Sequence, residues 1–135
     1  MRKIELIIIH CSATRCDRPF TVEALIRCHA DLFGFTGYHY YITRDGNVYQ
    51  TRHENLIGAH AKGYNSHSLG ICYEGGLNPR HEPADTRTEA QKQALRDLLR
   101  RLKARHPQAR IMGHRDLPGV HKDCPCFDCS EYQDL

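Results

Sequence analysis

The sequence of 135 residues contains no long hydrophobic run, and this absence restricts how the protein can relate to a membrane. Its longest apolar stretch covers residues 6–9. A membrane-spanning helix needs about 20 apolar residues, and the core of a signal peptide needs at least about 7. Membrane insertion is therefore excluded, and nothing marks an N-terminal segment for removal. We expect the protein to be made and folded in the cytoplasm.

A strong charge imbalance is also absent, because 19 Lys and Arg residues offset 16 Asp and Glu residues to give a net charge of +3. The basic residues are spread along the chain, which is a weak footprint for nucleic acid, so no nucleic-acid partner is expected. The mild positive charge is compatible with an anionic polymer. The chain has no internal repeat, low-complexity tract or linker, and its length suits one domain over residues 1–135.

The cysteines argue against a disulfide framework. There are seven of them, an odd number, and four are scattered through segments of different predicted structure. Reduced thiols are the better interpretation. The other three, Cys124, Cys126 and Cys129, lie within six residues and indicate a metal site.

Sequence patterns typical of strands and patterns typical of helices both occur along the chain, which predicts an α/β fold. Isoleucine-rich residues 4–9 predict a buried strand that ends at His10, and residues 109–113 predict a short strand that ends at His114. Two β-prone runs flank Asp45-Gly46, which is a strong hairpin signal, and residues 69–74 form another apolar strand.

Two amphipathic helices complete the predicted elements. One begins after Thr21 and closes at Gly34, and the other begins at a capping box from Thr88 to Gln91 and stops before Pro107. The order of elements predicts a single domain with a central mixed β-sheet flanked by helices.

His10, His114 and Cys124 are the candidate metal ligands. A catalytic zinc site needs three protein ligands on rigid elements and one open position for water. Two histidines at strand ends and a cysteine ten residues after the second meet that requirement. The residue pattern alone also allows hydrogen-bonded structural histidines. A small structural zinc site built from His121, Cys124, Cys126 and Cys129 is a further alternative.

Seven short words, read in order, carry a resemblance to a known family. They are HCSAT from His10, GYHY from Gly37, RDG from Arg44, GAHAKGYN from Gly58, SLGICYEGG from Ser68, GHRD from Gly113 and KDCPCFD from Lys122. In this order they resemble the type 2 N-acetylmuramoyl-L-alanine amidases, which include phage amidase-type lysozymes and peptidoglycan recognition proteins. The resemblance implies the fold of that family, one catalytic Zn²⁺ held by His10, His114 and Cys124, and peptidoglycan as the substrate.

The same resemblance implies roles for five further residues. Tyr38 and Lys122 are the implied catalytic helpers, and both can donate to the oxyanion that forms during amide hydrolysis. His60, Lys62 and Asn65 are the implied substrate contacts. Without the resemblance, Tyr38 reads as a packed aromatic residue, Lys122 as a surface lysine and residues 58–65 as a loop shaped by glycine.

The expected activity is cleavage of the amide bond between the lactyl group of N-acetylmuramic acid and L-alanine. A monomeric endolysin that depends on a holin to reach the wall, or a bacterial autolysin, would act in this way. The alternatives are a peptidoglycan-binding module without catalysis and a zinc-knuckle adaptor built on the C-terminal cysteines.

Overall fold

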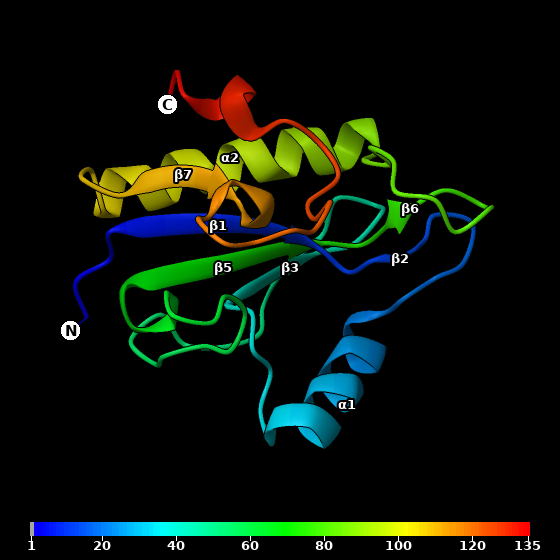
Figure 1. Cartoon of the computed structure of the whole chain (residues 1–135), viewed down its shortest axis with the longest axis horizontal. Coiled ribbons are helices and arrows are strands. Elements are labelled where there is room, and N and C mark those ends of the chain that lie inside the picture. Colours follow the sequence, from blue (N-terminus) through cyan, green and yellow to red (C-terminus); the bar gives the residue numbers. More distant parts are fainter. Residues whose placement is uncertain (1) are drawn as a thin grey trace.

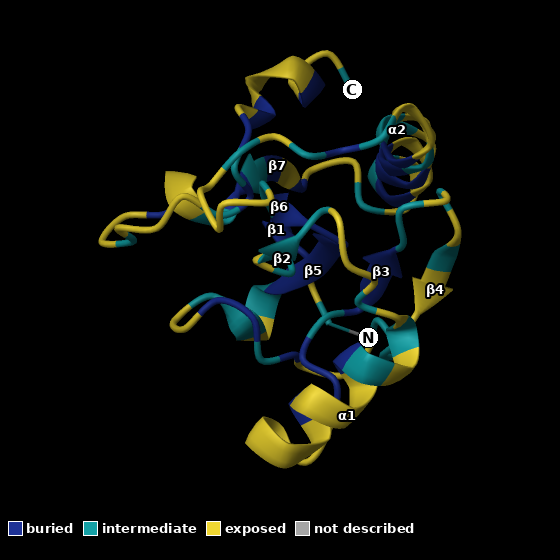
Figure 2. Cartoon of the chain, turned by 90° about the vertical axis from the view of Figure 1, so that its right-hand side faces the viewer, coloured by how far each residue is buried: buried dark blue, intermediate teal, exposed yellow. Residues whose placement is uncertain are grey.

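A computed structural model describes residues 2–135 as one α/β domain. A five-stranded sheet lies between two helices, α1 (Val22–Phe33) on one side and α2 (Glu89–Arg105) on the other, as Figures 1 and 2 show. The sheet has the order β4-β3-β5-β1-β7. Its strands are β1 (Leu6–Cys11), β3 (Tyr40–Ile42), β4 (Val48–Gln50), β5 (Ser68–Tyr73) and β7 (Arg110–Gly113).

The sheet is mixed, as the sequence predicts. Strands β3, β5, β1 and β7 run parallel to one another, and β4 pairs antiparallel with β3 in the predicted hairpin. A second sheet, which the sequence did not predict, joins β2 (Thr14–Arg15) to β6 (Gly76–Leu77). Three short 3-10 helices complete the elements: η1 (Asn65–His67), η2 (His114–Asp116) and η3 (Cys129–Tyr132).

Both helices begin and end where their sequence signals place them. The side chain of Thr21 caps α1 by accepting the Ala24 N–H, and Gly34 ends the helix in the left-handed region with a φ of 80°. Thr88 and Gln91 form the predicted capping box of α2. None of the helices within residues 2–135 combines the length and apolar character that a membrane crossing requires.

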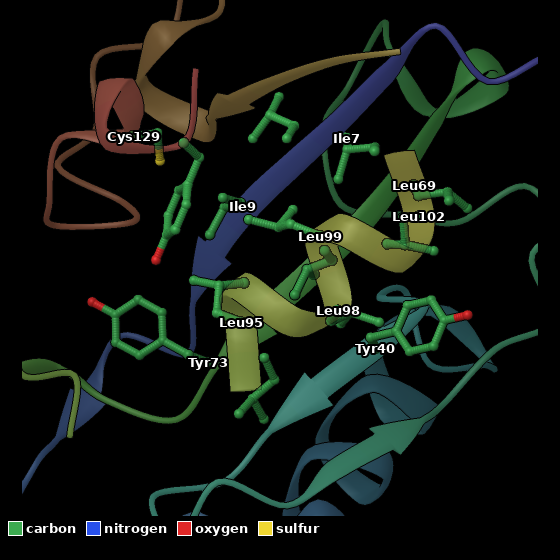
Figure 3. Packing of buried hydrophobic residues seen from close by; sticks show 14 of the residues in the cluster. Ile7, Ile9, Tyr40, Leu69, Tyr73, Leu95, Leu98, Leu99, Leu102 and Cys129 are labelled. Carbon is green, nitrogen blue, oxygen red and sulfur yellow. The ribbon is translucent and has the colours of Figure 1, made fainter. Parts of the chain in front are cut away.

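The central strands separate the core from the site because successive side chains of a strand point to opposite faces. On β1, Ile7 and Ile9 pack into the main core beneath α2, where Leu95, Leu98 and Leu99 meet them (Figure 3). Leu6 and Ile8 pack on the opposite face. His10 shares their alternation, so it points away from α2.

The chain after β7 folds back onto the core. Phe127 and Tyr132 are buried in the main cluster, and Arg87 holds this segment. The guanidinium of Arg87 bonds Asp85, Glu131 and the Tyr132 hydroxyl, and it lies 3.5 Å from the centre of the Phe127 ring. The C-terminal segment is therefore fixed to the loop that precedes α2.

Candidate functional site

His10, His114 and Cys124 meet at one end of the sheet. Their ligand atoms all lie within 4.8 Å of one another. Strands β1 and β7 pair in parallel with Ile9 opposite Gly113. The residues that directly follow these two, His10 and His114, are therefore neighbours of each other. Their ring centres are 4.6 Å apart. His10 lies inside β1 rather than directly after it, because the strand continues to Cys11.

Backbone hydrogen bonds hold the third residue of this group in place. The Cys11 N–H donates to the Cys124 sulfur at 3.3 Å, and the Arg115 N–H donates to the Cys124 carbonyl at 2.9 Å. The loop bearing Cys124 is thus attached to β1, which carries His10, and to η2, which carries His114.

The electrostatics of the three side chains favour a bound cation. Burial lowers the pKa of His10 well below its usual value, helped by the charges of His60 and His114. Burial and the nearby Lys122 ammonium lower the pKa of His114. Hydrogen bonding from the Cys11 thiol lowers the pKa of Cys124, despite the opposing effect of burial. Two neutral imidazoles and a thiol that ionises readily are the forms that bind zinc.

The donor geometry also fits zinc. His10 Nδ1 lies 3.8 Å from Cys124 Sγ. Tetrahedral zinc with ordinary bond lengths would separate such a nitrogen and sulfur by about 3.6 Å. Within the part of the chain that the structure describes, no other three His, Cys, Asp or Glu side chains come together in this way.

Cys126 and Cys129 lie outside this group. The Cys126 sulfur is 3.8 Å from the Cys11 sulfur, and Cys129 is buried in the main core. His121 is exposed. The structure therefore does not assemble the alternative zinc site considered for these residues.

A cleft of about 460 Å³ opens over the three ligands. Every residue predicted for the site lines it: His10, Tyr38, His60, Lys62, Asn65, His114, Lys122 and Cys124. A larger cavity of about 790 Å³ lies around Glu54. There the Glu54 carboxylate is already bonded by Tyr40, Arg105 and His106, so the smaller cleft is the candidate site.

Tyr38 lies beside the metal ligands in a protonated form. Its ring centre is 5.0 Å from that of His10. Burial raises the pKa of Tyr38 well above its usual value, and the nearby thiols Cys72 and Cys124 add to this effect. The phenol therefore remains a hydrogen-bond donor at neutral pH.

His29 is a residue of the cleft to which the sequence assigns no role. Its Nδ1 accepts the Gly37 N–H at 2.8 Å, and its ring centre lies 5.0 Å from that of Tyr38. It thus supports the segment that presents Tyr38. The available sequence signal was its helical spacing from Leu25, the other buried residue of α1.

His60 and Asn65 are bonded within the protein. His60 Nδ1 lies 2.9 Å from His10 Nε2, and His60 Nε2 lies 3.2 Å from the Ser68 hydroxyl. The Asn65 side-chain oxygen accepts the N–H groups of His60 and Ala61. Lys62 is exposed at the cleft. Substrate contact by these residues stays a prediction.

Glu74 directly follows β5, and its contacts are structural. It is 5% exposed, and its carboxylate accepts the backbone N–H groups of Phe20 and Arg44 at 2.6 and 3.0 Å. It is not among the residues that line the cleft.

Comparison with known proteins shows the family of this chain. The family profile described as N-acetylmuramoyl-L-alanine amidase matches residues 1–127. The endolysin of Klebsiella phage KP32 is 39% identical over 127 residues, which cover 93% of this chain and 83% of the relative. The solved structure of the N-acetylmuramoyl-L-alanine amidase LysC from Clostridium intestinale matches with a TM-score of 0.79 and 28% identity, over 96% of this chain and 81% of LysC.

A bumblebee protein, PGRP-SA, has the same fold, with a TM-score of 0.74 and 28% identity over 93% of this chain and 77% of its own. The family match covers nearly the whole chain, and the three predicted ligands come together in the structure. This protein therefore belongs to the N-acetylmuramoyl-L-alanine amidase family.

Proposed function

We propose that this protein is a zinc-dependent amidase that hydrolyses the bond between the lactyl group of N-acetylmuramic acid and L-alanine in peptidoglycan. The observation that carries the proposal is the grouping of His10, His114 and Cys124 at the base of a cleft, in a chain of this family. The family match covers residues 1–127, which is nearly all of the chain, so we infer that residues 1–135 act as one amidase domain.

The reaction adds water across the amide C–N bond, so the carbonyl carbon gains a hydroxyl group and the nitrogen gains a proton. His10, His114 and Cys124 would hold one zinc ion. When bound, zinc supplies Lewis-acid activation of the attacking water and of the scissile carbonyl.

Tyr38 and Lys122 stabilise the charge that develops on the carbonyl oxygen. The Tyr38 phenol stays protonated because of its burial, so it can donate a hydrogen bond to that oxygen or pass on a proton. The Lys122 ammonium lines the same cleft and lies near enough to His114 to lower its pKa. Donors of this kind contribute roughly 3 kcal/mol each to transition-state stabilisation in other hydrolases.

Lys62 and Asn65 orient the muramyl peptide. Both line the cleft beside the ligands, and Lys62 is exposed there. A lysine ammonium is suited to a substrate carboxylate, because the attraction between opposite charges favours that contact. The Asn65 side chain shapes the same wall by bonding two N–H groups of its own loop.

The biological setting that fits best is that of a monomeric endolysin, which is synthesised in the cytoplasm and acts on the cell wall after a holin releases it. Support comes from the endolysins among its relatives. A lysis assay with and without a co-expressed holin tests this part of the proposal separately from the chemistry.

The chemistry is tested with purified protein. We expect about one zinc per chain and release of free stem peptides from purified sacculi, with mass analysis showing cleavage at the lactyl amide. Cys124→Ser should lose the zinc and the activity, whereas Cys28→Ser removes an exposed thiol of α1 and should retain both. Sacculi bound without any peptide release by the zinc-loaded protein would contradict the proposal and favour a binding module.

A further inference from the structure

We propose that His60 is a positioning residue that orients the metal ligand His10 through a chain of hydrogen bonds ending at Ser68. This inference rests on the proposed zinc function of the site. The His60 ring is 9% exposed, and its Nδ1 is 2.9 Å from His10 Nε2. The rings meet edge to face, with an angle of 89° between their planes.

The direction of each hydrogen bond follows from the ligand geometry. Nδ1 of His10 faces the Cys124 sulfur at 3.8 Å, so Nδ1 is the nitrogen available to the metal. The proton of a neutral His10 ring must then reside on Nε2, which donates to His60 Nδ1. His60 in turn carries its proton on Nε2 and donates to the Ser68 hydroxyl at 3.2 Å.

Two features hold the His60 ring in the orientation that this chain requires. The side-chain oxygen of Asn65 accepts the His60 N–H at 2.9 Å and fixes the loop backbone. Beneath the ring lies Gly70 of β5, where an added Cβ would come within 2.6 Å of the imidazole. The close approach of ring to sheet is therefore possible only because this position has no side chain.

The hydrogen bond that His60 Nδ1 accepts from His10 Nε2 affects metal binding. A metal-ligating histidine normally donates its second N–H to a fixed partner, and loss of that partner weakens metal binding about 10- to 100-fold. His10 is 1% exposed, so no bulk water can replace the acceptor. Without His60 Nδ1, the His10 ring would lose both its fixed orientation and the partner of a buried donor.

Zinc affinity measured by competition with a chromophoric chelator tests the inference. His60→Phe keeps a ring of similar size but has no acceptor, and we expect its zinc Kd to rise about 10- to 100-fold. His60→Asn places an acceptor oxygen near the position of Nδ1, so its Kd should stay within about threefold of the wild type. The visible spectrum of the cobalt-substituted protein should change in the Phe variant and be restored in the Asn variant.

His39→Asn is the matched control. His39 is fully buried, and its ring centre is 5.9 Å from that of His60, but its polar partners are Gly70, Leu56 and Arg2 instead of a metal ligand. The inference predicts an unchanged zinc Kd for this variant. Equal weakening in His39→Asn and His60→Phe would overturn it, because loss of packing would then explain both.

A measurement on the wild-type protein avoids variants that fail to fold. Nitrogen-15 NMR of the zinc-loaded protein should show His60 protonated on Nε2 alone and His10 protonated on Nε2. A proton on His60 Nδ1 would overturn the inference while leaving the amidase proposal intact. A wild-type protein that takes up no zinc would instead overturn the proposed function, and this inference with it.

Discussion

At the scale of single residues, removal of one oxygen atom tests the role of Tyr38 separately from that of the candidate metal ligands. Tyr38→Phe keeps the ring that lies beside His10 and His29 but removes the donor. Because we propose the phenol as a donor to the developing oxyanion, we expect kcat on sacculi to fall about 100-fold. Zinc content should not change. Activity within threefold of the wild type would show that the Tyr38 hydroxyl is not a catalytic group.

Lys122 and Lys62 allow a comparison of two lysines in one cleft. Lys122→Met should lower kcat about 100-fold if the proposed role of its charge in stabilising the transition state is correct. Lys62→Met should mainly raise KM, because its proposed contact with the substrate is the same before and during the reaction. Steady-state kinetics on a defined muropeptide check both. A fall in kcat for Lys62→Met with KM unchanged would reverse the two assigned roles.

The residues that the sequence could identify are those that lie in short, recognisable words. His10, Tyr38, His114 and Cys124 stand within such words and line the cleft. The partnership of His60 with His10 could not be predicted in this way. It depends on a contact across 50 residues and on the absence of a side chain at Gly70, neither of which leaves a local pattern.

At the scale of elements, the anchoring of the C-terminal segment depends on Arg87. Its side chain is 3% exposed and bonds Asp85 and Glu131 at the same time. Arg87→Met should lower the free energy of unfolding by about 2 kcal/mol or more, since it breaks several charged hydrogen bonds at once. Urea denaturation measures this change.

Arg96→Met is the matched control for that experiment. Arg96 of α2 also reaches the C-terminal segment, but its partner Asp134 is 65% exposed. A surface ion pair of this kind contributes about 0 to 1 kcal/mol. Equal losses in the two variants would show that burial of Arg87 has no special importance.

Some features of the helices and strands could be predicted from the sequence, and others could not. The ends of α1 and α2 followed from their caps, because capping is local chemistry. The helix α1 is amphipathic, as predicted, but Ile26 and Phe33 on its apolar stripe are each 44% exposed. Periodicity gives the direction of a helix face, but the width of its contact depends on what packs against it. Pairing between β2 and β6 involves two residues on each strand, too few for any periodic signal.

At the scale of the whole molecule, the order of the strands creates the site. His10 and His114 are 104 positions apart in sequence and become neighbours because β7 adds to the sheet beside β1. Sequence predicted the strands of the five-stranded sheet, the hairpin pairing of β3 with β4 and the α/β class, but it did not predict the parallel pairings between the other strands. Pairing is decided by how the whole chain packs, so the site's residues were predictable and their contacts were not.

The buried histidines make the stability of the metal-free protein depend on pH. Burial lowers the pKa of His39 to about 4 and that of His60 to about 3. In the unfolded chain both titrate near the ordinary value of about 6.5. Between these limits the unfolded state binds more protons than the folded state, so the free energy of unfolding must fall as the pH falls.

The size of this effect gives a test of the whole fold. Each buried histidine should cost up to about 1.4 kcal/mol per pH unit below 6.5, so these two together should remove about 3 kcal/mol between pH 6.5 and 5. Urea denaturation of the chelator-treated protein at both pH values checks this. His39→Asn should reduce the pH dependence without abolishing it, because His10, His60 and His114 also have lowered pKa values. His53→Asn, a change at an exposed position, should leave it unaltered. Equal stability at the two pH values would mean that these rings gain protons without unfolding, and that the sheet face carrying the ligands opens to water.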